Sequence, residues 1–536
     1  MRKSTLSFVT AVSMALLLPQ QFASASTTSE VPDQPLAAGE IQEIGPGLYL
    51  SASDTYQVYE NDVDGGLMAR SHTIAGQPQG LAQAQDAPAA RSDLGVFGPG
   101  WEAEFVGGQL NRSLTQGAGS ITTKDLDTGE ATRYELTSSF DRPDGGSVNG
   151  YTAADGSTVV ETVLWDDLAG EMKATVVETP NLDLTTTAAD DDSFTDAQGN
   201  ALPASDLKPS YTWTRLPVSG DAWRVTSLGS KAFGSTTIAY DGVGRVSTVS
   251  ETATATDPAQ TVRVTYAGTS TAAGDTLGDV AGQVKDITVT TGATVQTLAR
   301  YRYDASGLLK QVTNPSEGID LAAYTYDGGD RLASMTSDDG TRWELSFTGD
   351  AAAPQALETT GSPVPGAEVD GDLGGEGLTP PAEEPIGSDP VGASSYPAQC
   401  WAANHWMRYT KSGCTTKVAH YGWRWPEWKT TPSGRKVRGI YKDHCTKSSD
   451  KPDGWDFRPA CDMHDYGYGV IGNAYTGHTH YLNRSKKGAV DTVFYNTLKD
   501  DVCSAYWRKT ACRNTAWIYY QAVKSQGNPR NGADAT

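Results

Sequence analysis

Cysteine is absent from about the first three quarters of this 536-residue chain, and histidine is nearly absent there. Residues 1–399 contain only His72, so they cannot form a disulfide or a metal site built from thiolates or several imidazoles. We expect His72 to lie in a flexible segment without a functional role. All six cysteines and the other six histidines follow residue 399, which confines such chemistry to the C-terminal part.

Long apolar runs are also missing. After the first 18 residues, no stretch approaches the ~18 apolar residues of a membrane-spanning helix. The beginning itself predicts a signal peptide over residues 1–25, with basic Arg2 and Lys3, an apolar segment at 6–18 and small residues at 23–25. We therefore expect a secreted, soluble protein without a transmembrane segment, in which disulfides are permitted.

The net charge of −23 is unevenly distributed. Residues 396–536 contain 21 Lys and Arg and 11 Asp and Glu, a net charge of +10, whereas the remainder carries −33. So abrupt a change indicates a domain boundary near residue 395. A basic C-terminal unit suits an anionic partner, either membrane phosphates or nucleic acid, although a solvated basic face explains the charge equally well.

The amino-acid composition indicates three regions between the signal peptide and residue 396. Residues 26–89 predict a partly disordered N-terminal segment, and residues 90–350 predict a β-rich region. Residues 351–395 are acidic and rich in proline and glycine. They predict an extended linker, because they contain too few large apolar residues to offset the entropy of ordering. We expect the last unit, 396–536, to fold and act without the others.

The β-rich region shows the alternation of half-buried strands, as in 261–266 and 286–290, with frequent turn-forming residues between the runs. It also contains a weak repeat in which Tyr-Asp is followed by a Gly-bearing turn and an apolar residue. The three copies are 240–246, 303–309 and 326–332. They resemble the YD repeat of Rhs-type proteins, which build β-sheet shells and often carry a C-terminal toxin domain. Three uneven copies are too few for a full shell, and ordinary hairpins are the alternative.

A helix beginning near Pro459 is predicted, because proline suits the first turn. On this helix Cys461, His464 and Tyr468 share one face, and Asp465 lies about 100° around from His464. The imidazole and the carboxylate of this His-Asp pair therefore point to adjacent regions, as a base and a metal ligand would.

A second helix is predicted over residues 487–503 from its apolar stripe. Asp491 borders that stripe near the helix start, where it could reach His464 on a facing helix and make it a better base. The alternative is a carboxylate that only complements the helix dipole.

Six cysteines in a secreted unit of this size suggest three disulfides, with 15 possible connectivities. Zinc is the competitor, but no CxxC pair is present. A Cys445–Cys461 bridge would tie Asp443 to the start of the His464 helix. Asp443 and Asp465 could then converge on one hard cation, because calcium prefers oxygen ligands.

Several segments after residue 440 resemble the secreted bacterial and fungal phospholipase A2 family. The matching segments are 443–445, 453–457, 460–468, 490–495 and 512–523. The resemblance implies a small, mainly α, disulfide-stabilised domain after the all-β region. It implies disulfides Cys445–Cys461 and Cys503–Cys512, which leave Cys400–Cys414.

The resemblance also assigns roles. His464 becomes the general base and Asp491 its support, while Asp443, the backbone carbonyl of His444, and Asp465 hold Ca²⁺. The implied activity is hydrolysis of the sn-2 ester of phospholipids in membranes or micelles, with no nucleic-acid partner. Such an enzyme could be a toxin-like effector on a YD-repeat carrier. The alternative is a non-catalytic cell-surface protein that binds lipid or another anion.

Overall fold

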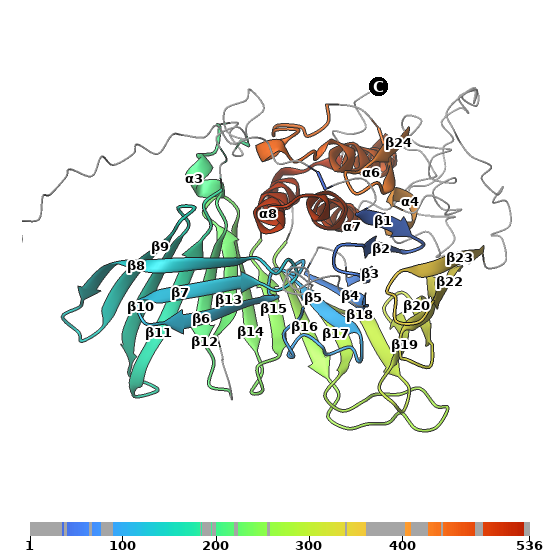
Figure 1. Cartoon of the computed structure of the whole chain (residues 1–536), viewed down its shortest axis with the longest axis horizontal. Coiled ribbons are helices and arrows are strands. Elements are labelled where there is room, and N and C mark those ends of the chain that lie inside the picture. Colours follow the sequence, from blue (N-terminus) through green and yellow to red (C-terminus); the bar gives the residue numbers. More distant parts are fainter. Residues whose placement is uncertain are drawn as a thin grey trace, which may run out of the picture. The chain divides into compact units, whose positions relative to one another are not determined.

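Antiparallel strands form the chain before residue 361, and helices dominate after residue 402 (Figure 1). This all-β region followed by a small helical unit confirms the predicted fold class. The computed structural model describes residues 35–36, 40–63, 67–76, 89–182, 184, 194–195, 200–218, 223–253, 258–337, 340–360, 403–408, 427–440, 443–476 and 486–529. The predicted signal peptide and the Cys400–Cys414 pair lie outside these residues. Among the described helices, none combines the length and hydrophobicity that crossing a bilayer requires.

A five-stranded antiparallel sheet begins before the predicted β-rich region, and its last strand lies within that region. Its strands are β1 (Ile41–Ile44), β2 (Gly47–Leu50), β3 (Thr55–Val63), β4 (Met68–Ala75) and β5 (Trp101–Phe105). His72 lies on β4, where it is 1% exposed and its ring centre is 4.9 Å from that of Trp101. The expectation that His72 lies in a flexible segment is therefore wrong, because β4 is an inner strand paired with both β3 and β5.

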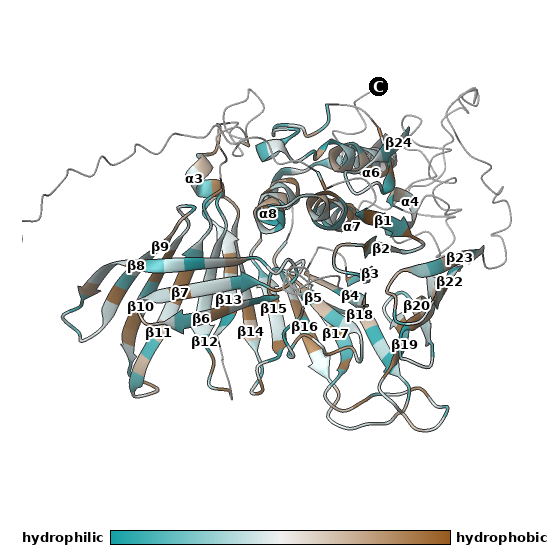
Figure 2. Ribbon diagram, in the orientation of Figure 1, coloured by the Kyte–Doolittle hydropathy of each residue, from teal (hydrophilic) through white to brown (hydrophobic). Residues whose placement is uncertain are grey.

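A long meander of antiparallel strands follows, in which each strand from β6 to β23 pairs with the next. Along the strands, hydrophobic and hydrophilic residues alternate (Figure 2), as the period of two predicts. The short helix α3 (Ala204–Leu207) lies between β11 and β12. The strands are β6 (Arg112–Gly117), β7 (Ser120–Asp125), β8 (Ala131–Asp141), β9 (Ser147–Ala153), β10 (Thr158–Asp166), β11 (Glu171–Thr179), β12 (Ser210–Arg215), β13 (Trp223–Ser230), β14 (Gly234–Tyr240), β15 (Val246–Glu251), β16 (Gln260–Tyr266), β17 (Val284–Thr291), β18 (Thr294–Tyr303), β19 (Leu309–Asn314), β20 (Ile319–Tyr326), β21 (Leu332–Ser337), β22 (Thr341–Phe347) and β23 (Pro354–Thr360).

Strand β23 extends the sheet to residue 360, inside the segment 351–395 that composition predicted to be linker. Its pairing with β22 explains the difference, because every residue from Pro354 to Thr360 has a partner on that strand. The remaining linker, residues 361–395, lies outside the described residues.

The three Tyr-Asp copies have a common geometry. The hydroxyls of Tyr240, Tyr303 and Tyr326 each donate to a backbone carbonyl 15 to 19 residues upstream, at 2.7 Å. Each tyrosine also lies where the strand register shifts. The aspartate that follows accepts hydrogen bonds from the amides two and four residues later. The tyrosine thus fixes the end of a strand, and the aspartate folds the turn that follows.

The C-terminal part consists mainly of three helices with a small hairpin. Its elements are α4 (Ala403–Met407), β24 (Glu427–Thr430), β25 (Lys436–Gly439), the 3₁₀ turn η2 (Pro452–Gly454), α6 (Arg458–Thr476), α7 (Lys487–Asn496), the π-helical segment η4 (Thr497–Val502), the 3₁₀ turn η5 (Cys503–Ala505) and α8 (Lys509–Gln526). The helix predicted over 487–503 is thus α7 continued by η4. Disulfides join Cys445 to Cys461 and Cys503 to Cys512, which confirms two of the expected bridges.

Helices α7 and α8 pack directly on the β region. A hydrophobic core runs continuously from the strands to these helices. Within it, Gln109 donates to the hydroxyl of Tyr495 at 2.9 Å, and the hydroxyl of Tyr211 lies 2.8 Å from the side-chain oxygen of Asn514. That residues 396–536 fold and act alone stays a prediction, and these contacts identify surface that the isolated unit would expose.

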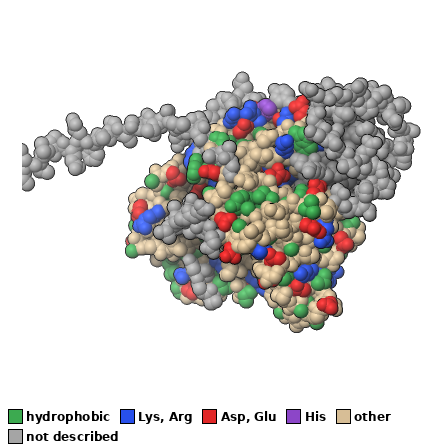
Figure 3. Space-filling view, turned by 45° about the vertical axis from the view of Figure 1, so that its right-hand side comes forward, with side chains coloured by type: hydrophobic (Ala, Val, Ile, Leu, Met, Phe, Trp, Pro, Cys, Tyr) green, Lys and Arg blue, Asp and Glu red, His purple; other side chains and the backbone are tan. Residues whose placement is uncertain are grey.

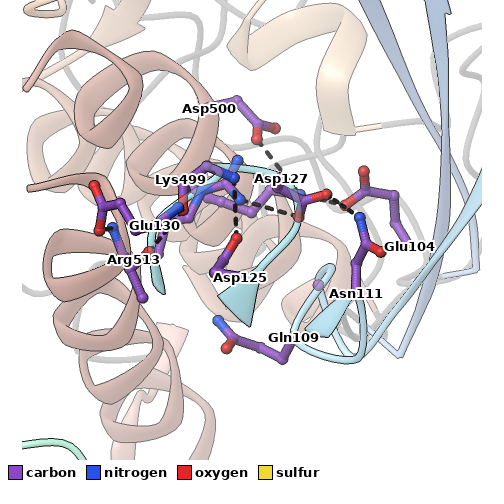
Figure 4. A network of polar contacts seen from close by, with 12 residues as sticks. Glu104, Gln109, Asn111, Asp125, Asp127, Glu130, Lys499, Asp500 and Arg513 are labelled. Atoms are coloured by element: carbon purple, nitrogen blue, oxygen red, sulfur yellow. Dashed lines mark hydrogen bonds and ion pairs between the residues drawn. The ribbon is translucent and has the colours of Figure 1, made fainter. Parts of the chain in front are cut away.

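Buried ion pairs cross the same interface (Figure 4). The ammonium of Lys499, 2% exposed, lies 2.7 Å from Glu104 on β5 and 3.4 Å from Asp500. Arg513 on α8 lies 3.0 Å from Asp127. Burial raises the pKa of Asp127 to about 7, although Arg513 opposes the shift. In this cluster, cations of the helical part are therefore paired with carboxylates of the β region that lie almost 400 residues earlier in the chain.

The first turn of α8 has its donors satisfied from the β region as well. The backbone amides of Lys509 and Thr510 donate to the carboxylate of Glu130 at 2.9 and 3.1 Å. A carboxylate at a helix N-terminus satisfies free N–H groups and complements the helix dipole. The β region thus contacts both the side of α8 and its N-terminal first turn.

We predict that Glu104→Gln destabilises the mature chain by about 3 kcal/mol, because it leaves the buried ammonium of Lys499 with less compensating charge. The matched control is Glu135→Gln, which removes a carboxylate 60% exposed and paired with Arg133. That change should cost at most about 1 kcal/mol. Urea unfolding followed by tryptophan fluorescence measures both. Equal effects would show that the Lys499 pair contributes no more than a surface pair.

Candidate active site

His464 and Asp491 form the centre of the candidate site. His464 lies on α6, and its Nε2 is 2.9 Å from Oδ1 of Asp491 on α7. Asp491 has no exposed surface, and His464 is 7% exposed. Two facing helices therefore bring together residues that are 27 positions apart in the sequence.

Two further groups hold Asp491. The hydroxyl of Tyr468 donates to Oδ1 at 2.8 Å, and the ammonium of Lys487 binds Oδ2 at 2.7 Å. Lys487 also donates to the backbone carbonyls of Val523 and Lys524 near the end of α8, where a cation complements the helix dipole. Burial raises the pKa of Asp491, but Lys487 and His464 outweigh burial and leave it below its ordinary value. The carboxylate is therefore held ionised.

The imidazole of His464 lines a cavity of about 220 Å³. Because Nε2 is bonded to Asp491, Nδ1 is the ring nitrogen left to take a proton from a molecule in the cavity. The rings of Tyr468 and Phe494 lie 4.0 and 4.8 Å from the imidazole, measured between ring centres. A base beside apolar rings suits a substrate with both a reactive polar group and a hydrocarbon part.

A disulfide-held loop forms another side of the cavity. The Cys445–Cys461 bridge ties this loop to the first turns of α6, and His444 and Asp465 both line the cavity. Nδ1 of His444 lies 2.7 Å from Asp462, which fixes the loop on α6. Asp443 is exposed, accepts a hydrogen bond from Thr446 at 2.7 Å, and is not among the residues that line the cavity.

The oxygen donors near this loop fit a calcium ion only in part. Asp465 faces the same cavity as His444, whose φ of 53° turns the chain sharply at that position. Among the described residues, no three His, Cys, Asp or Glu side chains are grouped as a metal site. A calcium ion here would therefore rely on two carboxylates at most, with backbone carbonyl and water oxygens completing its shell.

Sequence reasoning missed two members of the site. Lys487 precedes Asp491 by four residues on one helix, so the usual spacing of helical ion pairs could have identified it. Phe194, from the β region, also lines the cavity, and no pattern in the sequence indicated it. Asp500 and Asp501, two further acidic residues near the end of the predicted helix, lie in ion pairs with Lys499, Arg408 and Arg435.

Comparison with known proteins agrees with this geometry. Residues 408–527 match the family described as prokaryotic phospholipase A2, and residues 303–342 match the RHS repeat. A secretory phospholipase A2 of Arthroderma benhamiae is 37% identical over 93 residues, which are 16% of this chain and 57% of that protein. A secretory phospholipase A2 of Beauveria bassiana is 33% identical over 85 residues, 16% of this chain and 42% of that protein.

The chain thus spans about half the length of these curated relatives. The family match lies in the C-terminal part, which contains His464 and Asp491. The C-terminal part of the chain therefore matches the prokaryotic phospholipase A2 family, and it follows a segment that matches the RHS repeat.

Proposed function

We propose that this protein is a secreted, calcium-dependent phospholipase A2 that hydrolyses the sn-2 ester of glycerophospholipids. The observation that carries the proposal is the His464–Asp491 pair at 2.9 Å, because His464 lines a partly apolar cavity in the part of the chain that matches that family. An ester hydrolase needs a positioned base beside the space for an acyl chain. A protein that only binds lipid would need no such base.

The base works as a unit of three residues. Nδ1 of His464 takes a proton from water as the water attacks the ester carbonyl, and Asp491 orients the ring through Nε2 and stabilises the imidazolium. Lys487 keeps Asp491 ionised throughout. On the leaving side, the imidazolium returns its proton to the departing glycerol oxygen.

Calcium would be held by Asp465, Asp443 and the backbone carbonyl of His444. When bound, it supplies a positive charge that stabilises the oxyanion developing from the ester carbonyl. The proximity of Asp465 and His444 in one cavity supports this assignment.

Secretion is supported by the two disulfides, which persist in oxidising compartments, and by the secretory phospholipases among the relatives. Residues 396–536 carry a net charge of +10, and in Figure 3 Lys and Arg side chains lie beside a histidine at the upper edge, with Asp and Glu side chains among them. Such a face favours the phosphates of a membrane surface or micelle over a neutral partner. The adjoining RHS repeat supports a toxin-like effector on a repeat-bearing carrier.

We predict that chelation of calcium by EGTA abolishes release of fatty acid from phosphatidylcholine by the mature chain, and that added calcium restores it. Asp465→Asn should raise the calcium concentration needed for half-maximal activity. Asp456→Asn is the control, because that carboxylate binds Arg458 and does not line the cavity. Full activity in the chelator would contradict the metal assignment. A folded chain that binds vesicles but releases nothing would support the binding-protein alternative.

We predict that His464→Ala lowers kcat/KM by about 10²–10⁴ with little loss of fold, the range typical of general-base catalysis. Asp491→Asn should cost less activity, because Tyr468 and the helix packing still partly orient the ring. The double variant should be little worse than His464→Ala, since residues that act as one unit are not additive. Losses that multiply would show that Asp491 does not serve His464.

Lys487→Met should move the acid limb of the kcat/KM–pH profile to higher pH. Lys487 lowers the pKa of Asp491, so its removal makes the His464–Asp491 pair hold a proton to higher pH. Lys451→Met removes one charge from a half-exposed position and should leave the limb in place. An unchanged profile for Lys487→Met would indicate that this lysine only supports the fold.

A further inference from the structure

Among the residues that the structure describes, one from the β region lines the catalytic cavity. This residue is Phe194, and the other described residues that line the cavity lie between 444 and 528. The phenyl ring is 5% exposed, so it is part of the wall and not a side chain at the rim. The match to the phospholipase family covers residues 408–527, so it does not extend to this position.

Contacts from both parts of the chain hold Phe194 in place. Its carbonyl accepts a hydrogen bond from the amide of Leu202 at 2.7 Å, within the β region. Its ring meets Tyr519 of α8 edge-on, with ring centres 5.4 Å apart. The next residue, Thr195, accepts a hydrogen bond from Gln526 at the end of α8.

An ion pair strengthens this attachment. Lys524 near the end of α8 pairs with Glu251 at the end of β15, and both side chains are largely buried. Together with the Gln526 contact, the pair fixes the end of α8 on the β region beside Phe194.

The cavity has a polar and an apolar side. His464, Asp465 and the loop at 444–448 supply the polar side, where the ester would react. Phe494, Tyr519, Ala522, Val523 and Phe194 supply the apolar side. Phe494 is in contact with His464 and therefore connects the two sides. An acyl chain whose carbonyl is at His464 would thus extend over α8 towards Phe194.

We propose that Phe194 is a specificity-determining residue, a wall of the acyl-chain site by which the β region limits the sn-2 chain that the enzyme accepts. The proposal rests on the proposed phospholipase activity. It assigns the β region a direct role in substrate selection, in addition to any role as a carrier.

The test compares phosphatidylcholines that differ only in the sn-2 chain, hexanoyl, decanoyl or palmitoyl, in mixed micelles with the full mature chain. Phe194→Ala removes the wall and should shift kcat/KM towards longer chains, while Phe194→Trp should shift it towards shorter ones. Each methylene that gains or loses apolar contact changes the ratio by about fourfold. The ratio between chains does not depend on how much protein is folded, and Phe194→Leu provides a milder variant should the alanine variant fold poorly.

Phe233→Ala is the matched control. The ring of Phe233 lies 6.4 Å from that of Phe194, between ring centres, but Phe233 does not line the cavity. This variant removes the same ring from the same cluster and should leave the chain-length ratio unchanged. Wild-type ratios in all Phe194 variants, or an equal shift in Phe233→Ala, would overturn the proposal.

A binding assay distinguishes failure of this proposal from failure of the proposed function. If the wild type releases no fatty acid with calcium present, the phospholipase assignment fails by itself. Displacement of an environment-sensitive fluorescent fatty acid by hexanoate, decanoate and palmitate then tests the wall without chemistry. Phe194→Ala should favour the longer acids relative to wild type. If the preference among the three acids is the same in both proteins, the proposal is overturned.

Discussion

The buried charge of Asp491 is the constraint on which the helical part depends. A carboxylate without exposed surface is costly unless cations and hydrogen-bond donors surround it. Those partners come from α6, through His464 and Tyr468, and from α7 itself, through Lys487. Lys487 in turn binds carbonyls near the end of α8. One charge thus fixes three helices, and the same contacts that stabilise it orient the imidazole of His464.

Buried charges also require compensating partners where the helices meet the β region. Lys499 is buried beside Glu104, and Arg513 beside Asp127, so each cation depends on a carboxylate from the other part of the chain. Buried pairs of this kind favour one arrangement over others, because a shifted arrangement would leave a charge without compensation. The relative position of α8 and the strands is therefore specified by charge as well as by apolar contact.

Local patterns predicted much of this structure. The Tyr-Asp copies could be recognised because each performs its task within about 20 residues, through one hydroxyl bond and one turn. The α6 and α7 helices follow from spacing along single segments. Strand β23 was missed because Pro354 and the acidic residues near it suggested a linker, whereas pairing with β22 decided the outcome.

The contacts of the helical part, including the candidate site, likewise fall into those that sequence patterns predict and those that they do not. The His464–Asp491 contact could be predicted because both residues lie in motifs with a family resemblance, and Lys487 could have been found from helical spacing. The pairing of Lys499 with Glu104 could not, because 395 residues separate them and neither lies in a motif. The same holds for Phe194, whose neighbours in sequence give no sign of a cavity more than 250 residues away.

Phe194 also bears on what the β region is for. A carrier that only transports an enzyme needs a linker and a surface, and it gains nothing by contributing an aromatic ring to the wall of a cavity. Here the end of α8 is attached to β15 and to Thr195, which holds that ring against Tyr519. Loss of these attachments would open the cavity beside His464 and expose apolar surface that now faces the acyl site. The β region therefore contributes to the wall of the cavity, and the proposed selection of the sn-2 chain requires both regions to remain together.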